Sequence, residues 1–512
     1  MKYFLGIDNG GSVTKAALYS SSGEEIAVCS VETEMITPKI DFTERNMDEM
    51  WEANCRVIRD LLKKSGIAPE SIAGIACCGH GKGLYLWGKD GKPVRNGIIS
   101  TDNRAWRYPI QWQEDGTAQK VFAISYQSIL ACQPVSLLAW LRDNEPECID
   151  KIQWVFECKD YVRFRLTGEA CAEITDYSGA NFLNLKTRQY DPELLKLFGI
   201  EFAQSMLPPL KNSADICGYI SEEAARATGL QAGTPVAGGM FDIDACAIAV
   251  DAAHEDRVCM ITGTWSINEY IRREAVLDGS VLLNSIFCLP EYYLIEECSP
   301  TSAGNNEWFI NAMMPELRDK AKQEGKSVYD VVNALVESVP FDEFCPIFLP
   351  FLMASNVHPN AKASFVGLSN YHTRAHVVRS IYEGIVFSHK YHFDKLMKTR
   401  DKSVSEIRLA GGVANSRVWT QIFADVMQYP IVVVDVGETG ALGCAMTAAV
   451  AVKEYADFEQ AAQKMVKVKY QLMPDKKAVP VYEKKYVMYR KVIDSLNIIW
   501  DDMQKLMSQN ES

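Results

Sequence analysis

Apolar and polar positions near the N-terminus predict three short strands followed by a helix. The strand-like stretch "YFLGID" begins at Tyr3, and a glycine-rich turn separates it from the next strand, "KAALYS". The turn "SSSGEE" then precedes "IAVCSVET", so the three strands are expected to form an antiparallel meander. Residues 47–65 place apolar side chains at helical spacing, and "IAGIACCGHG" follows as a short buried strand ending in glycines. This β-β-β-α-β order differs from the βαβ order of dinucleotide-binding folds.

A related pattern recurs in the second half of the chain. The stretches "TPVAGGMFDIDACAIAV" and "DRVCMITGTWSINEYI" each predict a strand, a glycine turn and a strand. Glycine hairpins near residues 8–12 and 261–266 therefore indicate a duplicated scaffold. Because 512 residues exceed one ordinary hydrophobic core, the chain is expected to contain more than one domain. We predict an N-terminal domain over 1–245, a C-terminal domain over 246–450 and peripheral helices over 451–512.

Composition narrows the class of protein. Apolar residues make up 48% and charged residues 23%, as in ordinary globular proteins. The formal charge of −13 comes from dispersed acids, which argues against nucleic acid or an anionic membrane as a partner. No apolar run approaches the roughly 20 residues of a membrane span, and no signal peptide is recognisable at the start. The fifteen cysteines include no C-x-x-C pair, so we expect reduced core thiols and a cytoplasmic location.

The first glycine turn carries the residue types of a phosphate site. The backbone N–H groups of Gly10 and Gly11 can approach phosphate oxygens closely, and Ser12 and Lys15 add a hydroxyl and a positive charge. Asp8 would repel a phosphate unless a divalent cation lay between them, and Mg²⁺ commonly bridges a carboxylate and phosphates. The alternative is an ordinary hairpin turn, which Asp, Asn and Gly also favour.

The second glycine stretch offers an acid for proton transfer. Asp242 follows two glycines in an apolar region, where a carboxylate can act as general base beside a reacting hydroxyl. Asp244 competes for this role, and both acids have an alternative reading as turn residues or helix caps. The later turn at Gly263 and Thr264 offers another phosphate cradle.

The third glycine stretch, "LAGGVANSRVW", suits a flat ligand such as adenine. A strand ends here at Gly411 and Gly412, and Asn415 lies near the start of a helix. A strand–helix turn without any ligand would show the same pattern.

Taken together and in this order, these motifs resemble those of the FGGY carbohydrate kinases, members of the actin-like ATPase superfamily. The similar stretches run from the first hairpin to about residue 450 and include "GIDNGGSVTKAAL", "GGMFDIDACA", "ITGTW" and "AGGVANSRVWTQIFADV". The resemblance implies an α/β fold with two actin-like (ribonuclease H-like) domains and a cleft between them. The chain departs from the family pattern at Lys362 and Ala363, where many relatives carry Arg-Gly.

The resemblance also implies an activity, transfer of the γ-phosphoryl group of ATP to a sugar or polyol hydroxyl with Mg²⁺. Asp242 corresponds to the base and lies near the metal, and Asp8 corresponds to the acid on the metal side. The implied nucleotide-binding residues are Gly10, Gly11, Ser12, Lys15, Gly263, Thr264, Gly411, Gly412 and Asn415. Phosphoryl transfer needs alignment and charge neutralisation more than covalent chemistry, which these residue types can supply.

Two polar loops of the N-terminal half are candidates for binding the sugar, because the equivalent loops of family members do so. "GHGKG" contains His80 and Lys82, and "STDNRAW" contains Asp102 and Arg104. Together with Asp242, these four residues form our predicted substrate site. The alternatives are a structural role for His80 and a surface ion pair for Asp102 and Arg104.

The loop sequences resemble most the L-xylulose kinase branch of the family. Glycerol kinases carry Arg-Glu and xylulokinases Met-His in the first loop, where this chain has Gly81 and Lys82. We therefore predict a ketopentose substrate such as L-xylulose, with another pentulose, a keto-sugar acid or a polyol as alternatives. A non-catalytic sugar sensor or an ATP-driven chaperone on the same scaffold is an alternative from a different class. The sequence leaves the oligomeric state open, with a homodimer among the options.

Overall fold

The computed structural model describes residues 2–263, 265–281 and 283–508, and the chain divides into two compact units. The first unit comprises Met1–Ala253, Ile271–Ile295 and Val436–Lys467, and the second comprises His254–Tyr270, Glu296–Asp435 and Val468–Ser512. Each unit therefore joins segments that are distant in the sequence. The division predicted from the sequence ran along the chain in three contiguous segments.

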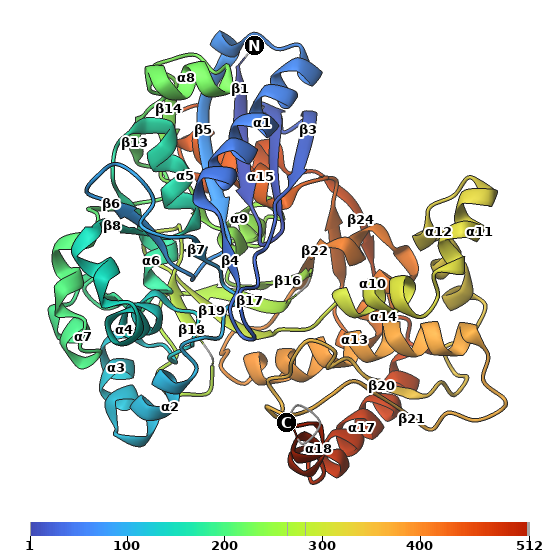
Figure 1. The fold of residues 1–512 in the computed structure, drawn as a ribbon. Helices are drawn as coiled ribbons and strands as arrows, with labels where there is room; N and C mark the ends of the chain where they lie inside the picture. Colours follow the sequence, from blue (N-terminus) through green and yellow to red (C-terminus); the bar gives the residue numbers. More distant parts are fainter. Residues whose placement is uncertain (1, 264, 282, 509–512) are drawn as a thin grey trace. The chain divides into compact units, whose positions relative to one another are not determined.

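The first unit is built on a mixed sheet in the order β13-β14-β5-β1-β2-β3 (Figure 1). Strands β1 (Tyr3–Asn9), β2 (Val13–Ser20) and β3 (Glu25–Glu32) form the predicted antiparallel meander. Strand β5 (Ile72–Gly79) lies parallel to β1. The predicted helix is confirmed as α1 (Met47–Ser65). It begins after the capping side chain of Asn46 and ends at Gly66, which adopts a left-handed conformation.

Helices cover both faces of this sheet. Successive strand residues point to opposite faces, and Leu5 and Ile7 pack in one core with the apolar side of α1. Gly6 faces the other way, towards α15 (Thr439–Ala451). A Cβ atom on Gly6 would lie 1.8 Å from the carbonyl oxygen of Ala441, so only glycine lets this helix approach the strand.

The segment around Asp242 contains less β-strand than the sequence predicted. Strand β14 (Pro235–Ala237) is followed by the two-residue β15 (Met240–Phe241), and helix α9 (Asp242–Ala249) begins immediately afterwards. The prediction of a full second strand was wrong because the alanine-rich "DIDACAIA" favours a helix and an acid is stabilised in its first turn.

The second unit contains a sheet in which β17, β16, β22, β23 and β24 are neighbours in this order. Strands β16 (Arg257–Thr262) and β17 (Ser266–Arg272) form the predicted hairpin. Strand β22 (Glu406–Gly411) is parallel to β16, and β23 (Ile431–Val434) is parallel to β22. Helix α14 (Arg417–Met427) connects β22 to β23.

Residues 451–512 contain a strand in addition to the predicted helices. Helices α16 (Phe458–Met465), α17 (Val479–Leu496) and α18 (Trp500–Ser508) are present. Between them β24 (Val468–Leu472) pairs antiparallel with β23 at the edge of the sheet. The strand is short and mostly exposed, so it lacks the apolar run by which a buried strand is recognised.

The remaining elements are the other strands and the other α-helices. The other strands are β4 (Glu44–Arg45), β6 (Tyr85–Gly88), β7 (Gly97–Ile98), β8 (Ile152–Phe156), β9 (Ala172–Glu173), β10 (Leu183–Asn184), β11 (Gln189–Tyr190), β12 (Leu210–Lys211), β13 (Ile216–Tyr219), β18 (Leu283–Ile286), β19 (Tyr293–Ser299), β20 (Ile347–Leu349) and β21 (Ser364–Val366). The other α-helices are α2 (Arg107–Glu114), α3 (Thr117–Ser125), α4 (Pro134–Asn144), α5 (Cys158–Thr167), α6 (Ile174–Ser178), α7 (Pro192–Leu197), α8 (Glu222–Thr228), α10 (Gly304–Ala312), α11 (Glu316–Glu324), α12 (Val328–Glu337) and α13 (Arg374–Met397).

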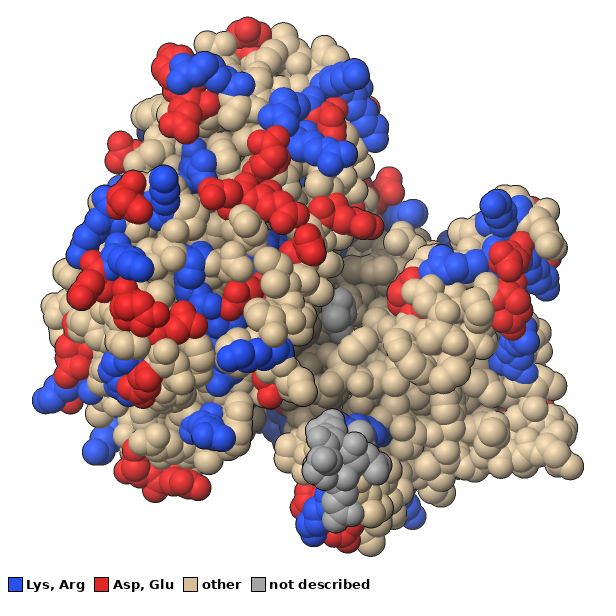
Figure 2. Space-filling model, in the orientation of Figure 1, with Lys and Arg blue, Asp and Glu red and all other residues tan. Residues whose placement is uncertain are grey.

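Surface charge and cysteine state follow the sequence-based expectations. Lys, Arg, Asp and Glu side chains are interspersed over the visible face of the first unit (Figure 2). None of the fifteen cysteines is in a disulfide, and twelve of them are buried. Within the described parts of the chain, no helix is both long and apolar enough to cross a membrane.

Candidate active site

Strand register brings the two predicted catalytic acids to one end of the first sheet. Asp8 on β1 is aligned with Cys78 on β5, which is in turn aligned with Met240 on β15. Asp242 lies two residues beyond Met240, so it follows the same sheet edge two strands away from Asp8. Burial raises the pKa of Asp242 well above its ordinary value, and the charge of Asp8 raises it further. The two carboxylates are thus close enough to influence each other.

Two glycines of α15 let this helix lie against Asp8 and against the helix that begins at Asp242. A Cβ atom on Gly440 would lie 2.6 Å from Oδ2 of Asp8. A Cβ atom on Gly443 would lie 2.2 Å from the carbonyl oxygen of Ala245, in the helix that begins at Asp242. The helix therefore closes the space behind the acids, and side chains at these two positions would displace its neighbours. The sequence analysis missed both glycines, although the spacing of "TGALG" is the signal of a closely packed helix.

Lys15 lies opposite Asp8 in the antiparallel register and forms an ion pair with Glu438, the residue before α15. Its Nζ is 2.7 Å from Oε2 of Glu438. Burial lowers the pKa of Lys15, but its hydrogen bond to Glu438 and the charges of Glu438 and Asp8 outweigh burial and raise it. Burial also raises the pKa of Asp8, while the charge of Lys15 opposes that increase. Lys15 is half-buried and charged, as a phosphate-side cation must be.

The glycine turn after Asp8 is held by an arginine that the sequence analysis missed. Arg45 on β4 is 1% exposed, and its guanidinium donates to the carbonyl oxygens of Gly10 and Gly11. Ser12 is exposed beside them. Because the buried Arg45 binds the carbonyl oxygens of Gly10 and Gly11, it fixes the turn without occupying the N–H groups of the turn or the hydroxyl of Ser12. An arginine that follows a glutamate in the polar segment "DFTERNM" gave no sequence signal for this role.

The two candidate residues of the first sugar loop differ in their surroundings. His80 is buried, with Nε2 2.8 Å from the hydroxyl of Tyr85, and burial together with the charge of Arg45 lowers its pKa to about 3. This contact favours the structural alternative for His80. Lys82 places its Nζ 5.1 Å from the ring centroid of Phe241, and its charge lowers the pKa of Asp242. Of the two, Lys82 is therefore the one that lies near the predicted base.

Asp102 and Arg104 form a buried ion pair. Nη2 of Arg104 lies 2.8 Å from Oδ2 of Asp102 and 2.8 Å from Oε1 of Glu44. The guanidinium also lies over the ring of Phe42, 4.1 Å from its centroid. The alternative of a surface ion pair was wrong, because Asp102 is 2% and Arg104 5% exposed. Since Glu44 precedes Arg45, this pair is connected through β4 to the glycine turn.

In the second unit, the sheet register brings two predicted nucleotide-binding segments together. Thr262, at the end of β16, is aligned with Gly411 at the end of β22. Gly411 has a φ of 90°, and a Cβ atom there would lie 2.7 Å from the carbonyl oxygen of Thr262, so glycine is required. Gly412 and Asn415 are exposed in the turn that follows, and Gly263 follows Thr262. Thr264 lies outside the described residues.

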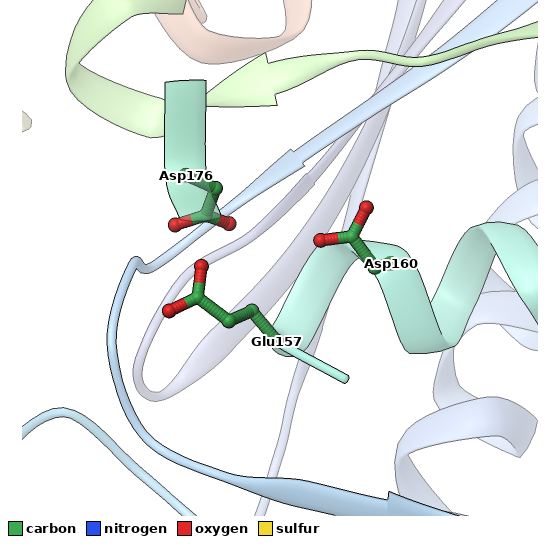
Figure 3. Close-up of side chains that lie close together, drawn as sticks. All are labelled: Glu157, Asp160 and Asp176. Carbon is green, nitrogen blue, oxygen red and sulfur yellow. The ribbon is translucent and has the colours of Figure 1, made fainter. Parts of the chain in front are cut away.

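A buried charge cluster next to Asp242 was also missed. Nζ of Lys159 contacts Oδ2 of Asp160 at 2.9 Å, Oδ2 of Asp176 at 3.1 Å and Oε2 of Glu173 at 3.4 Å. Carboxyl oxygens of Glu157, Asp160 and Asp176 lie within 4.8 Å of one another, and those of Glu157 and Asp176 face each other in Figure 3. Burial, followed by the charge of Asp176, raises the pKa of Glu157 well above its ordinary value. The ammonium of Lys159 already supplies positive charge to these acids. The apolar residues on both sides of Lys159 and Asp160 in "VFECKDYVRF" were the sequence signal that these charged residues are buried.

The structure separates the two acids that competed for the role of base. Asp244 is fully buried in α9, and its Oδ1 accepts a hydrogen bond from the backbone N–H of Cys288 at 3.2 Å. Asp242 is partly exposed at the start of the same helix. A base must reach the substrate hydroxyl, so this difference favours Asp242.

Comparison with known proteins decides the family. The model of the N-terminal domain of the FGGY family of carbohydrate kinases matches residues 3–249, and the model of the C-terminal domain matches residues 258–452. The chain belongs to the FGGY family of carbohydrate kinases. It is 38% identical over 497 residues to an L-xylulose/3-keto-L-gulonate kinase of Escherichia coli (strain K12), covering 97% of each chain. It is 27% identical to an erythritol kinase of Brucella abortus (strain 2308), covering 98% of this chain and 97% of that protein.

The fold has a close counterpart among solved structures. A ligand-bound xylulose kinase from Lactobacillus acidophilus superimposes with a TM-score of 0.87 at 24% identity, covering 98% of this chain and 100% of that chain. The predictions of family, two-domain fold and activity class are confirmed, and this FGGY family member is a carbohydrate kinase that phosphorylates a sugar with ATP.

Proposed function

We propose that this FGGY kinase phosphorylates a hydroxyl of a ketopentose, with L-xylulose as the first candidate, and that Asp242 is the general base. The substrate proposal is supported by the 38% identity to a kinase named for L-xylulose and 3-keto-L-gulonate. The catalytic proposal rests on one observation, a partly exposed acid at the start of α9 whose pKa is raised by burial and by Asp8. A raised pKa makes a carboxylate a better proton acceptor at neutral pH.

The residues around Asp8 fit a divalent cation. Asp8 and Asp242 supply carboxylate oxygens, which Mg²⁺ prefers, and the charge of Asp8 disfavours the anionic form of Asp242. A bound Mg²⁺ would neutralise charge on the phosphates and between the two acids. In this proposal Asp8 and Asp242 hold the metal, and Gly10, Gly11, Ser12 and Lys15 bind the phosphates.

Of the remaining predicted residues, those of the nucleotide site and Lys82 keep their predicted roles, and three residues of the sugar loops take a different one. Gly263, Gly411, Gly412 and Asn415 of the second unit are assigned to the nucleotide. Lys82 is assigned to the sugar because it lies next to Phe241 and Asp242. His80, Asp102 and Arg104 are proposed to shape the sugar loops from behind, because all three are buried. Asp242 orients the attacking hydroxyl as well as accepting its proton.

The test is the substitution Asp242→Asn, with Asp244→Asn as the matched control from the same helix. The expected result is a loss of kcat of about 10²–10⁴-fold for Asp242→Asn with ATP binding retained, because the amide cannot accept the proton. Asp244→Asn should keep kcat near the wild-type value, since this acid is fully buried and accepts a backbone hydrogen bond. Wild-type turnover by Asp242→Asn would remove the base assignment.

The substrate is tested by ADP release in the presence of L-xylulose, D-xylulose, 3-keto-L-gulonate and erythritol. We expect kcat/KM to be highest for L-xylulose. A higher kcat/KM for one of the other compounds would change the proposed substrate but not the proposed kinase activity. ATP hydrolysis that no sugar stimulates would favour a sensor or chaperone instead.

A further inference from the structure

We propose that Thr175 is a positioning residue for the reaction at Asp242, and that it acts through a buried hydrogen-bond network anchored on Lys159. This inference rests on the proposed function, in which Asp242 is the base. It assigns a role to the charge cluster of α5 and α6, whose residues supply none of the predicted ligand contacts.

The network holds the backbone immediately before Asp242. The N–H of Phe241 donates to Oγ1 of Thr175 at 2.9 Å. The hydroxyl of Thr175 has one proton, which it donates to Oε2 of Glu173 at 2.7 Å. Its direction is therefore fixed, with a lone pair left to accept from Phe241. Thr175 is fully buried, so water does not compete for these bonds.

Glu173 is itself held in place by several donors. Its Oε1 accepts from the hydroxyl of Ser213 at 2.7 Å and from the backbone N–H of Thr175 at 3.1 Å. Its Oε2 lies 3.4 Å from the ammonium of Lys159. A carboxylate with this many donors has little freedom to rotate. The hydroxyl of Thr175, which donates to this carboxylate, is therefore held in one orientation as well.

A second branch holds the glycines at the start of the same segment. Nη1 of Arg163 donates to the carbonyl of Gly238 at 2.5 Å, while its Nη2 pairs with Oδ1 of Asp160 at 2.6 Å. The N–H of Gly239 donates to the carbonyl of Ser213 at 3.1 Å. Residues 238–241 are thus fixed from the side of α5 and α6, next to their pairing with β5.

This arrangement bears on catalysis because Asp242 is the first residue after the fixed segment. Its side chain must meet a substrate hydroxyl within hydrogen-bond distance, and a misplacement of about 1 Å can reduce a rate about 10²-fold. Strand β15 contributes only two residues of pairing, so pairing alone is a weak constraint. The hydroxyl of Thr175 adds a side-chain constraint on the residue immediately before the base.

The test compares Thr175→Val, which replaces the hydroxyl with a methyl group, with Thr175→Ser, which keeps the hydroxyl. Thr175→Val is expected to lower kcat at least tenfold while the KM values for ATP and sugar stay within about threefold, because Lys82 and the residues assigned to the nucleotide are not held by Thr175. Thr175→Ser is expected to restore kcat to within about threefold of wild type. If Thr175→Val leaves kcat unchanged, or if both variants lose kcat equally, the proposal is overturned.

Thr228→Val is the matched control. Thr228 is also fully buried in the first unit, accepts a backbone N–H from Leu230 at 3.2 Å and donates to the carbonyl of Ala224 at 2.7 Å. It should lower thermal stability as Thr175→Val does, with kcat retained. If Thr175→Val does not fold, Ser213→Ala tests the same network more gently. It removes one donor to Glu173 and is expected to lower kcat about two- to fivefold with unchanged KM, and an unchanged kcat would count against the proposal.

The double variant Asp242→Asn, Thr175→Val separates this inference from the proposed function. If Thr175 acts through Asp242, Thr175→Val adds little further loss in the Asp242→Asn background. An inactive Asp242→Asn with a fully active Thr175→Val removes only the inference. An active Asp242→Asn removes the proposed function itself.

Discussion

Replacing Gly440 with alanine is expected to damage catalysis by displacing Asp8. The new Cβ atom would lie 2.6 Å from Oδ2 and 2.9 Å from Cγ of Asp8, and 3.2 Å from the sulfur of Cys78. Restoring an ordinary contact requires the carboxylate to withdraw by about 0.8 Å, because such contacts begin near 3.4 Å. The backbone of α15 gives way less easily, since Gly443 and Ala441 are packed against backbone atoms on either side.

The size of the effect follows from this displacement. A misplacement of about 1 Å in a catalytic group can reduce a rate about 10²-fold. We therefore expect kcat of Gly440→Ala to fall about 10- to 100-fold, which corresponds to about 1.4–2.7 kcal/mol of activation free energy. The Mg²⁺ concentration needed for half-maximal rate should rise as well, because Asp8 is the proposed metal-side acid.

The assay is a coupled measurement of ADP release at saturating sugar, with Mg²⁺ varied, together with thermal unfolding. Alanine favours a helix over glycine by up to about 1 kcal/mol, so the unfolding temperature of Gly440→Ala should change little. Gly443→Ala is the contrasting variant, because its Cβ would meet the backbone of Ala245 at 2.2 Å and must separate two helices. We expect it to lose stability. Wild-type kcat and Mg²⁺ dependence in Gly440→Ala would refute the reasoning that ties Asp8 to the metal.

Two further predictions concern the second unit. Gly411→Ala should raise KM for ATP at least tenfold and lower the unfolding temperature, since Gly411 has a φ of 90° and a Cβ would lie 2.7 Å from the carbonyl oxygen of Thr262. Gly412→Ala, with no atom within 4 Å of its Cβ, should keep the unfolding temperature, and equal stability losses in the two variants would contradict this account. Burial raises the pKa of Asp425 to about 6. The folded state therefore binds the proton of Asp425 more tightly than the unfolded state. The contribution of Asp425 to the free energy of unfolding falls as pH rises from about 4 to 6. In urea unfolding, wild type should therefore lose about 1 kcal/mol relative to Asp425→Asn between pH 5 and pH 7, and a constant difference would show that Asp425 does not titrate in this range.

The sequence predicted the secondary-structure elements and turns that depend only on neighbouring residues. The meander, helix 47–65 and the glycine turns were recognisable because strand alternation, helical spacing and turn residues are local properties. The family motifs then located Asp8, Asp242 and the glycines at 411 and 412. Nothing in these patterns depends on contacts between distant parts of the chain.

What the sequence did not reveal depends on such contacts. Arg45 supports the glycine turn from a strand of two residues, and Gly440 meets Asp8 from more than 400 positions away. Asp102 and Arg104 were predicted to bind the sugar, with a surface ion pair as the alternative, whereas aromatic and acidic neighbours from other segments bury them as an ion pair. Thr175 and Lys159 reach the segment before Asp242 only through side-chain contacts between distant parts of the chain, so no local pattern connected them to Asp242.

The late position of α15 has a consequence for the synthesis of the protein. The strand that carries Asp8 leaves the ribosome long before the helix that packs on Gly6 and Asp8, which begins only at Thr439. At about 5–20 residues per second, the nascent chain waits roughly 20–90 s before this face of its first sheet can be covered. During that interval the face of the sheet beside Gly6 is open to chaperones, and a chain that ended before Thr439 would leave this face uncovered.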